Sequence, residues 1–256
     1  MSCYDRTIFQ CNCCYTNVLN MESLKGKKVL LIGATGGIGQ ATAKLLLASQ
    51  AQLFLTGRSG EKLNQLKDQF PDANFFPLDI TNAAEVDALG KVFTHTMGVP
   101  DIIINAAGIG IIKPVEQLSV EEFMMSLQTN LAGTFYIIKT FLPAMKEVKK
   151  GLIINIPGVL GKVPMAGAAA YSASKYGLIG MMQSIREELK RTEIRITNLI
   201  LGGVDSPFWD TINLRVQKDK MIRAEEAARA IWFLCQQPAS GVVSEMVLQP
   251  FNHQAV

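Results

Sequence analysis

Tyr171 and Lys175 stand four residues apart in a stretch with a helical pattern of apolar residues, so their side chains are expected on one helix face. A free tyrosine has a pKa of about 10 and is a poor base at neutral pH. A neighbouring ammonium group stabilises the phenolate and lowers this pKa, which makes proton exchange with a carbonyl or alcohol oxygen feasible. The spacing predicts an acid–base pair, although an incidental tyrosine and lysine on a helix also fit these two residues taken alone.

Three glycines, Gly33, Gly37 and Gly39, lie where the first apolar run meets a helical pattern. Glycine lets the backbone turn sharply and approach a pyrophosphate, and the free N–H groups of the following helix attract the phosphate charge. A glycine triplet alone is a weak signal, because an ordinary strand–helix turn can carry one. Its place at the first such junction of a long alternating chain favours nucleotide binding.

The choice of nucleotide is expected to depend on Gly57 and Arg58, at the end of the second apolar run. An acidic residue at this point would hold the ribose 2′-hydroxyl and repel a 2′-phosphate. Gly57 stands at that position, and the guanidinium of Arg58 can pair with a phosphate in a bidentate manner. We therefore expect NADP(H) to be preferred over NAD(H), with a solvated surface arginine as the alternative.

From Lys28 onward, short apolar runs alternate with helix-period segments, which indicates βαβ units and a parallel sheet. Several runs are apolar at consecutive positions, as is typical of strands covered by helices on both faces. We expect an α/β fold of the Rossmann type, a doubly wound parallel sheet of about seven strands in three α/β/α layers. The expected strands are Val29–Ile32, Gln52–Thr56, Asn74–Pro77, Ile102–Asn105, Leu152–Ile156, Ile194–Ile200 and Glu245–Leu248, and the expected helices are 37–49, 60–69, 82–97, 119–147, 171–191 and 224–236.

The composition limits the class of protein. The chain has 256 residues, of which 48% are hydrophobic, and a formal net charge of +3; this excludes global disorder and suits one α/β domain. Lysine and arginine form no cluster longer than a triplet, so no nucleic-acid partner is expected. No apolar run reaches the ~18 residues that span a bilayer. We expect a cytoplasmic protein with no membrane partner.

Four of the five cysteines, Cys3, Cys11, Cys13 and Cys14, lie near the start of the chain. Their spacing lacks the paired two-residue separation and the histidine partners of a zinc site, so no metal is expected. Met21 precedes a sequence typical of the start of an α/β domain. We interpret residues 1–20 as a disordered or mis-started leader, with a metal or redox leader as the alternative. Residues 21–256 are then a single NAD(P)-binding domain.

The motifs Gly33-x-x-x-Gly37-x-Gly39, Asn105-Ala-Ala-Gly108 and Tyr171-Ser-Ala-Ser-Lys175 occur in this order. In them the chain resembles the short-chain dehydrogenase/reductase family, from about Leu24 to Pro250. Leu78-Asp79-Ile80-Thr81 is similar to the family's adenine-contacting segment. Leu201–Pro207 is similar to its nicotinamide-contacting loop, although Leu201 stands where proline is usual and Ile32 replaces the common threonine before the first glycine.

The resemblance implies that Tyr171 is the acid–base residue, that Lys175 also holds the nicotinamide ribose, and that Asn130 anchors a water in a proton relay. The function implied is hydride transfer between NADP(H) and a small-molecule carbonyl or alcohol. The implied cofactor contacts are Gly33, Thr35, Gly37, Ile38, Gly39, Arg58, Ser59, Asp79, Ile80, Asn105, Ala106, Ala107, Gly108, Tyr171, Lys175, Gly202, Val204 and Ser206.

One member of the family's catalytic set is missing. Where the family carries a serine that hydrogen-bonds the substrate oxygen, this chain has Gly158. Loss of a donor that steadies a reacting oxygen costs on the order of 10²–10³ in rate. Three accounts stay open: a substrate that brings its own hydroxyl or amide, a weakened reductase that still turns over, and a catalytically impaired subunit that binds NADP(H) without redox chemistry.

Around Gly158, the side chains of Val159, Met165, Phe208 and Trp209 are expected to form a mainly apolar substrate wall. This wall favours a neutral, apolar carbonyl or alcohol, although each of these residues fits a core or subunit contact as well. The resemblance also implies a homodimer or homotetramer built through the helices near 119–147 and 171–191. The second of these carries an apolar face expected to meet a partner helix, formed by Leu178, Ile179, Met181, Met182 and Ile185.

Overall fold

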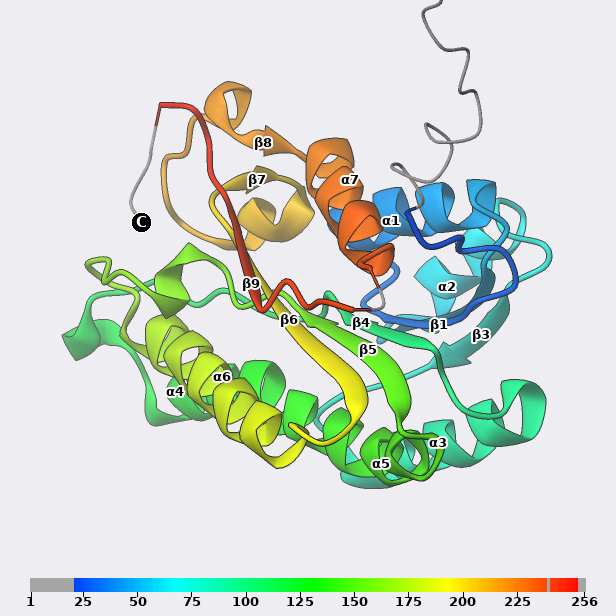
Figure 1. Ribbon diagram of the computed structural model, residues 1–256. Helices are drawn as coiled ribbons and strands as arrows, with labels where there is room; N and C mark the ends of the chain where they lie inside the picture. Colours follow the sequence, from blue (N-terminus) through cyan, green and yellow to red (C-terminus); the bar gives the residue numbers. More distant parts are fainter. Residues whose placement is uncertain (1–20, 239, 253–256) are drawn as a thin grey trace, which may run out of the picture.

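The computed structural model describes residues 21–238 and 240–252; the interpretation of residues 1–20 as a leader concerns residues outside this part of the chain. A seven-stranded sheet runs through the middle of the protein (Figure 1). Every neighbouring pair of its strands is parallel, which confirms the predicted Rossmann-type sheet. In sheet order the strands are β3 (Asn74–Pro77), β2 (Gln52–Gly57), β1 (Lys28–Ile32), β4 (Ile102–Asn105), β5 (Lys150–Asn155), β6 (Glu193–Leu201) and β9 (Glu245–Leu248).

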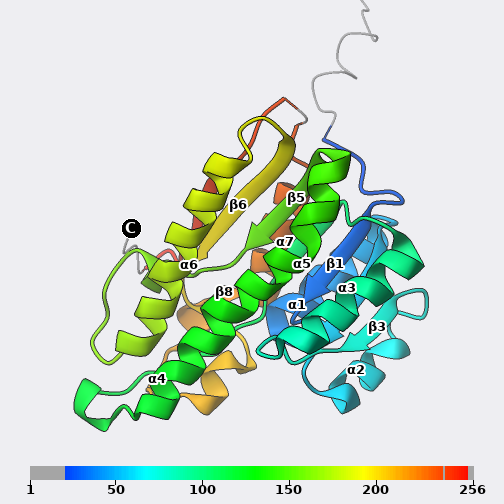
Figure 2. The same ribbon diagram turned by 90° about the horizontal axis from the view of Figure 1, so that it is seen from below.

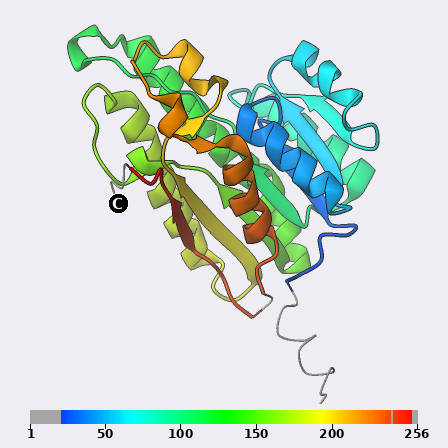
Figure 3. The ribbon, with the colours of Figure 1, turned by 90° about the horizontal axis from the view of Figure 1, so that it is seen from above.

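Helices cover both faces of this sheet because its central strands are apolar on both sides. Val29 and Leu31 of β1 belong to one buried cluster, which also contains side chains of α1 (Gly37–Ala48), α2 (Gly60–Lys67) and α7 (Ala224–Cys235). Figure 3 looks down on the face covered by α1 and α7. Alternate side chains point to opposite faces of a strand, so β1 contributes side chains to two cores.

Leu30 and Ile32 belong to the second cluster, on the opposite face. This cluster includes side chains of α3 (Ala83–Met97), α5 (Gly133–Val148) and α6 (Ala169–Glu188), which lie in front of the sheet in Figure 2. The helices on the two faces and the sheet between them make the three predicted layers. No helix in the described part of the chain has the length and hydropathy that crossing a membrane requires.

The helix expected over residues 119–147 is present, but it is not α-helical throughout. It consists of α4 (Val120–Leu127), a π-helical turn η2 (Gln128–Ala132) and α5. Isolated π turns inside helices are rare and mark places where the regular i to i−4 hydrogen bonds are diverted. Asn130 lies in the middle of this turn, so the interruption positions one of the predicted site residues.

The apolar face of α6 is also used differently from the prediction. Leu178, Ile179 and Met182 are buried within the chain itself, and Leu178 and Met182 belong to the second core cluster. A helix that covers a sheet must bury its apolar stripe there. These three side chains are therefore not available to a partner helix.

In the sheet, β2 and β3 lie on one side of β1, and β4 and the strands after it lie on the other side. Ligands bind at such a change in strand order in open α/β sheets. Short elements that the sequence pattern did not predict lie beyond the carboxyl ends of the strands. β7 (Val204–Asp205) and β8 (Ile222–Arg223) form a second, two-stranded parallel sheet. It carries between its strands the turns η4 (Pro207–Thr211) and η5 (Lys218–Lys220), and two further turns of this kind are η1 (Val115–Gln117) and η3 (Val159–Gly161).

Candidate active site

The glycine turn at the end of β1 has the shape of a phosphate cradle. Gly33 has a φ of +82°, and a Cβ atom on it would lie 2.8 Å from the backbone nitrogen of Ala107. A Cβ on Gly39 would overlap the Gly33 carbonyl oxygen, so β1 and α1 approach each other more closely than any side chain allows. Gly36 is the N-cap of α1 and makes no side-chain hydrogen bond to the helix, and no acidic residue lies in the first turn. The helix N-terminus therefore offers donors and a positive dipole end to an anion.

The predicted nicotinamide loop lies against this cradle. A Cβ on Gly37 would be 3.1 Å from the Cβ of Ser206, although the two residues are far apart in the sequence. Within the loop, the hydroxyl of Ser206 donates to the carbonyl oxygen of Val204, which is the first residue of β7. Gly202 packs on the tail, because a Cβ there would be 2.6 Å from Cδ of Pro250.

The end of β2 leaves no room for an acidic side chain. A Cβ on Gly57 would lie 2.8 Å from Cγ2 of Thr35, which belongs to the glycine turn. Arg58 is exposed, and within the described residues no carboxylate pairs with it. Ser59 is the N-cap of α2, where its hydroxyl accepts a 3.3 Å hydrogen bond from the nitrogen of Lys62.

The predicted adenine segment and the segment after β4 are both fixed by internal hydrogen bonds. Asp79 is half-buried, and its carboxylate accepts from the nitrogen and the hydroxyl of Thr81 at 2.9 and 2.7 Å. The side chain of Ile80 is buried and belongs to the second core cluster. The amide of Asn105 donates to the hydroxyl of Thr134 at 2.8 Å. Asp79 is therefore the more accessible side chain of its pair.

Tyr171, Lys175 and Asn130 come together beside Gly108. Nζ of Lys175 lies 5.5 Å from the centroid of the Tyr171 ring and donates to the carbonyl oxygen of Ile156 at 3.2 Å. A Cβ on Gly108 would be 3.1 Å from Oδ1 of Asn130 and 3.3 Å from Nζ of Lys175. The segment after β4 thus meets α6 and the π turn at one point.

The side chain of Asn130 clamps this segment. It is buried, its Oδ1 accepts from the nitrogen of Ile109 and its Nδ2 donates to the carbonyl oxygen of Ile109, both at 2.9 Å. Nδ2 also lies 3.0 Å from the hydroxyl of Ser174. With its amide engaged on both sides, Asn130 positions the backbone. Ser174 and Thr134, which contact Asn130, are not among the predicted site residues. The only sign of such a role in the sequence is that each is a polar residue among apolar neighbours on a buried helix face.

Burial shifts the pKa values of Tyr171 and Lys175, the predicted acid–base pair. Desolvation raises the pKa of Tyr171 above its usual value, and it lowers the pKa of Lys175 to about 8. The net shift of the tyrosine pKa is therefore upward, opposite to the direction expected from the ammonium group alone. The physical reason is that the low-dielectric surroundings disfavour the charged forms of both side chains.

Gly158 lies beside the tyrosine hydroxyl. A Cβ at this position would be 3.7 Å from Oη of Tyr171 and 3.6 Å from the carbonyl oxygen of Leu201. Gly158 has φ +77° and ψ 165°, a region of backbone space that is essentially restricted to glycine. A serine here would need either a strained or a rearranged backbone, so more than a hydroxyl group distinguishes this site from the family pattern.

The expected substrate wall is only partly assembled around the tyrosine. The Phe208 ring lies against the Tyr171 ring, with centroids 5.9 Å apart, and Trp209 meets Phe208 edge-on at 5.4 Å. Val159 follows Gly158 at the start of η3, and the half-buried Met165 lies between η3 and α6. Of the four predicted wall residues, Phe208 is thus the one whose ring packs on the ring of Tyr171.

Two buried asparagines below this site have no counterpart in the sequence predictions. Asn155 of β5 and Asn198 of β6 are in register on neighbouring strands, and both are fully buried. Neither side-chain amide makes a hydrogen bond within the described part of the chain. Buried amides are normally paired with protein or with water, so this pair is costly unless water reaches it.

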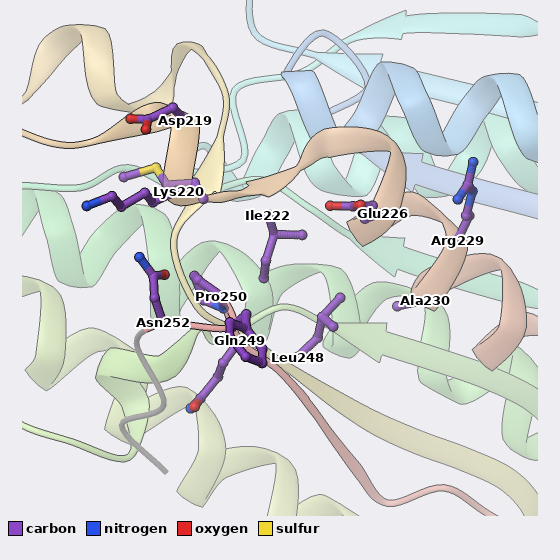
Figure 4. Close-up of a pocket in the computed structure, with 12 residues that line it drawn as sticks. Asp219, Lys220, Ile222, Glu226, Arg229, Ala230, Leu248, Gln249, Pro250 and Asn252 are labelled. Carbon is purple, nitrogen blue, oxygen red and sulfur yellow. The ribbon is translucent and has the colours of Figure 1, made fainter.

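A separate cavity of about 750 Å³ lies behind the nicotinamide loop. Figure 4 shows Asp219 and Lys220 of η5 on one side of it, Glu226 and Arg229 of α7 on another, and Leu248 and the tail below. Tyr171, Lys175 and Asn130 do not line it. Among the described residues, no group of three or more His, Cys, Asp or Glu side chains could hold a metal ion.

Comparison with known proteins gives consistent matches. Residues 27–217 match the family model described as short chain dehydrogenase. An uncharacterised oxidoreductase of Staphylococcus aureus is 32% identical over 232 residues, which cover 90% of this chain and 100% of the relative. The closed form of a serine dehydrogenase complexed with NADP+ has a TM-score of 0.82 at 26% identity, covering 88% of this chain and 96% of the other. An alcohol dehydrogenase of Thermococcus sibiricus complexed with 5-hydroxy-NADP has a TM-score of 0.81 at 25% identity, covering 90% and 99%.

Proposed function

The chain belongs to the short-chain dehydrogenase family, and we propose that it transfers a hydride between NADP(H) and a carbonyl or alcohol. The observation that carries this proposal is the meeting of Tyr171 and Lys175 with the segment after β4, at the edge of the sheet where the glycine cradle also lies. A binding protein has no evident need for a buried tyrosine next to an ammonium group. The relatives named above include an oxidoreductase and two dehydrogenases.

A nicotinamide dinucleotide fits the residues of this site. The cradle of Gly33, Gly37 and Gly39 excludes side chains, and the N-terminus of α1 is open to a pyrophosphate. Gly108 and Lys175 are suited to the nicotinamide ribose, and Ser206 of the predicted nicotinamide loop lies against Gly37 of the cradle. When bound, the nicotinamide supplies or accepts the hydride. The further contacts we assign to the cofactor are Thr35, Ile38, Ser59, Asp79, the backbone at Ile80, Asn105, Ala106, Ala107, Gly202 and Val204.

The proton is handled by Tyr171. Because burial raises its pKa, the phenol keeps its proton at neutral pH and is ready to donate it from Oη to a carbonyl oxygen. Lys175, with a pKa of about 8, is mainly protonated at pH 7 and stabilises the phenolate that donation leaves behind. The side chain of Asn130 holds the segment after β4 at Ile109. Its backbone is our candidate for anchoring the relay water.

Without a serine at position 158, the Tyr171 hydroxyl is the one donor that we assign to the substrate oxygen. Reduction of an unactivated ketone is therefore expected to be slow, by roughly the 10²–10³ that a lost donor costs. A catalytically impaired NADP(H)-binding subunit is the second candidate, and the Gly158 backbone supports it. The substrate class we assign to the enzyme is neutral and apolar, because Val159, Met165, Phe208 and Trp209 bring no charge.

We assign NADP(H) over NAD(H) on the chemistry of the β2 end. Gly57 cannot be replaced by an acidic residue without displacing Thr35, and the exposed guanidinium of Arg58 is suited to a 2′-phosphate. Arg58→Ala should weaken NADPH binding by at least about tenfold, or ~1.4 kcal/mol, and leave NADH binding unchanged. Lys67→Ala, at the other end of α2, is the matched control. An equal loss of affinity for NADPH and NADH in Arg58→Ala would refute the assignment.

The exposed apolar side chains of α4 and α5 support a homo-oligomer. Val120, Met124, Met125 and Phe135 are 74%, 52%, 53% and 44% exposed, and large exposed apolar groups on one helical segment are typical of subunit contacts. We assign this surface to a second copy of the chain. Sedimentation of the protein with Phe135→Asp and Met125→Asp should show smaller particles than the parent.

The central test follows NADPH oxidation with a panel of aldehydes and ketones, together with NADPH binding measured by fluorescence. Tyr171→Phe should bind NADPH like the parent and lose turnover by at least 10²-fold. Tyr176→Phe, an exposed tyrosine on the same helix, is the control and should keep both. Binding without turnover in the parent itself would favour the impaired subunit, and failure to bind either nucleotide would refute both functions.

A further inference from the structure

The Phe208 side chain occupies the approach to the acid–base tyrosine. Its ring packs on the Tyr171 ring at a centroid distance of 5.9 Å and an interplanar angle of 45°. On its other side it touches the segment after β4, at Gly110. The ring therefore spans the gap between β4 and α6, the two elements that border the reacting centre.

Gly110 is the seat of this ring. A Cβ on Gly110 would overlap Cζ of Phe208, and it would be 3.0 Å from Cε1 of Phe208 and 2.9 Å from Cδ1 of Ile212. Real Cβ atoms do not approach other atoms this closely. A side chain at position 110 and the Phe208 ring in its present place are therefore mutually exclusive.

The turn that carries Phe208 is held by side-chain hydrogen bonds and an ion pair. Nε1 of Trp209 donates to the carbonyl oxygen of Val204 at 2.8 Å, and the carboxylate of Asp210 pairs with Lys218 at 2.7 Å. The second contact is an exposed ion pair, and such pairs contribute little to stability. η4 is thus fixed by these contacts and by backbone hydrogen bonds of its own, and the Phe208 ring can leave Gly110 by a change of its side-chain rotamer.

We propose that Phe208, seated on Gly110, is the side chain that selects carbonyl substrates by size. This inference rests on the hydride-transfer function proposed above. With the ring seated against Tyr171, we expect room on the Phe208 side of a bound carbonyl for a hydrogen or a methyl group. A larger substituent has to displace the ring from Gly110 and break its contact with Tyr171. The site therefore prefers aldehydes and methyl ketones over ketones with two bulky substituents.

The first experiment measures kcat/KM with NADPH for benzaldehyde, acetophenone and isobutyrophenone. Phe208→Ala should lower the benzaldehyde to isobutyrophenone ratio by at least about tenfold, the scale that a few methylene groups contribute to selectivity. Gly110→Ala should lower the same ratio, and adding it to Phe208→Ala should change nothing further. Phe233→Ala, which removes an exposed ring from α7, is the control and should leave the ratio unchanged. If Phe208 had a purely structural role, Phe208→Ala would lower kcat/KM equally for all three compounds. That result would overturn the proposal.

The second experiment needs no turnover, so it separates this inference from the proposed function. The chain has two tryptophans, and a Trp232→Phe background leaves Trp209, which packs on Phe208, as the only indole. Quenching of its fluorescence by acrylamide should rise at least about twofold in Gly110→Ala, because the unseated ring uncovers it. Unchanged quenching would overturn the seating of Phe208 on Gly110, even if NADPH oxidation were normal. Inactivity of the parent with a normal quenching response would instead count against the hydride-transfer function.

Discussion

Replacing Lys175 by methionine should stabilise the protein while it destroys the active site. Lys175 is 4% exposed, and burial lowers its pKa from 10.5 to about 8. At about 1.36 kcal/mol for each pH unit, this difference means that keeping the ammonium group charged costs the folded state ~3 kcal/mol at pH 7. Lys175→Met removes that cost and keeps the length of the side chain.

The same substitution also removes two favourable interactions of the ammonium group, which offset part of the gain. The hydrogen bond to the Ile156 carbonyl oxygen contributes about 1 kcal/mol, and the interaction with the Tyr171 ring contributes a similar amount, about 0.5–1 kcal/mol. The net expectation at pH 7 is a rise of about 1 kcal/mol in the free energy of unfolding. Urea unfolding of the nucleotide-free protein measures it.

The pH dependence is the sharper part of this prediction. Because the folded pKa lies below the unfolded one, the unfolded state binds more protons between about pH 8 and pH 10.5, and the stability of the parent rises through that window. The methionine variant lacks this rise. The parent should therefore be the less stable protein at pH 7 and the more stable one near pH 10. A difference between the two that does not change with pH would refute the reasoning.

Other substitutions test the remaining features. Gly158→Ala and Gly158→Ser should each lower the free energy of unfolding by about 1–3 kcal/mol, because φ is +77° there; a serine variant with parental stability in urea would contradict the assigned backbone. Asn198→Leu should raise the unfolding free energy by about 1 kcal/mol, since its buried amide has no partner in the described part of the chain; a loss instead would point to an ordered water. Gly39→Ala should weaken NADPH binding and lower the thermal midpoint, whereas Gly180→Ala, with open space around its Cβ on α6, should raise stability by about 0.5–1 kcal/mol.

Most of the strands and the glycine turn could be predicted because their signals are local. Leu30 to Ile32 and Ile102 to Ile104 are apolar without interruption, and a glycine turn follows β1 directly. β7 and β8 could not be predicted, because two-residue strands carry no periodicity and exist only where Val204 and Ile222 meet. The π turn at Asn130 was missed for a similar reason: the residues that hold its side chain, Ile109 and Ser174, are distant in the sequence.

The sequence by itself determined the α/β alternation, the presence and spacing of Tyr171 and Lys175, and the glycine at position 158. Tertiary structure decided the direction of the tyrosine pKa, because desolvation depends on atoms that several distant segments bring together. It also decided that Leu178 and Met182 face the sheet and that Phe208 covers the tyrosine from a seat on Gly110. Residue type and spacing state which groups are present, whereas burial and close approach are properties of pairs that only the folded chain brings into contact.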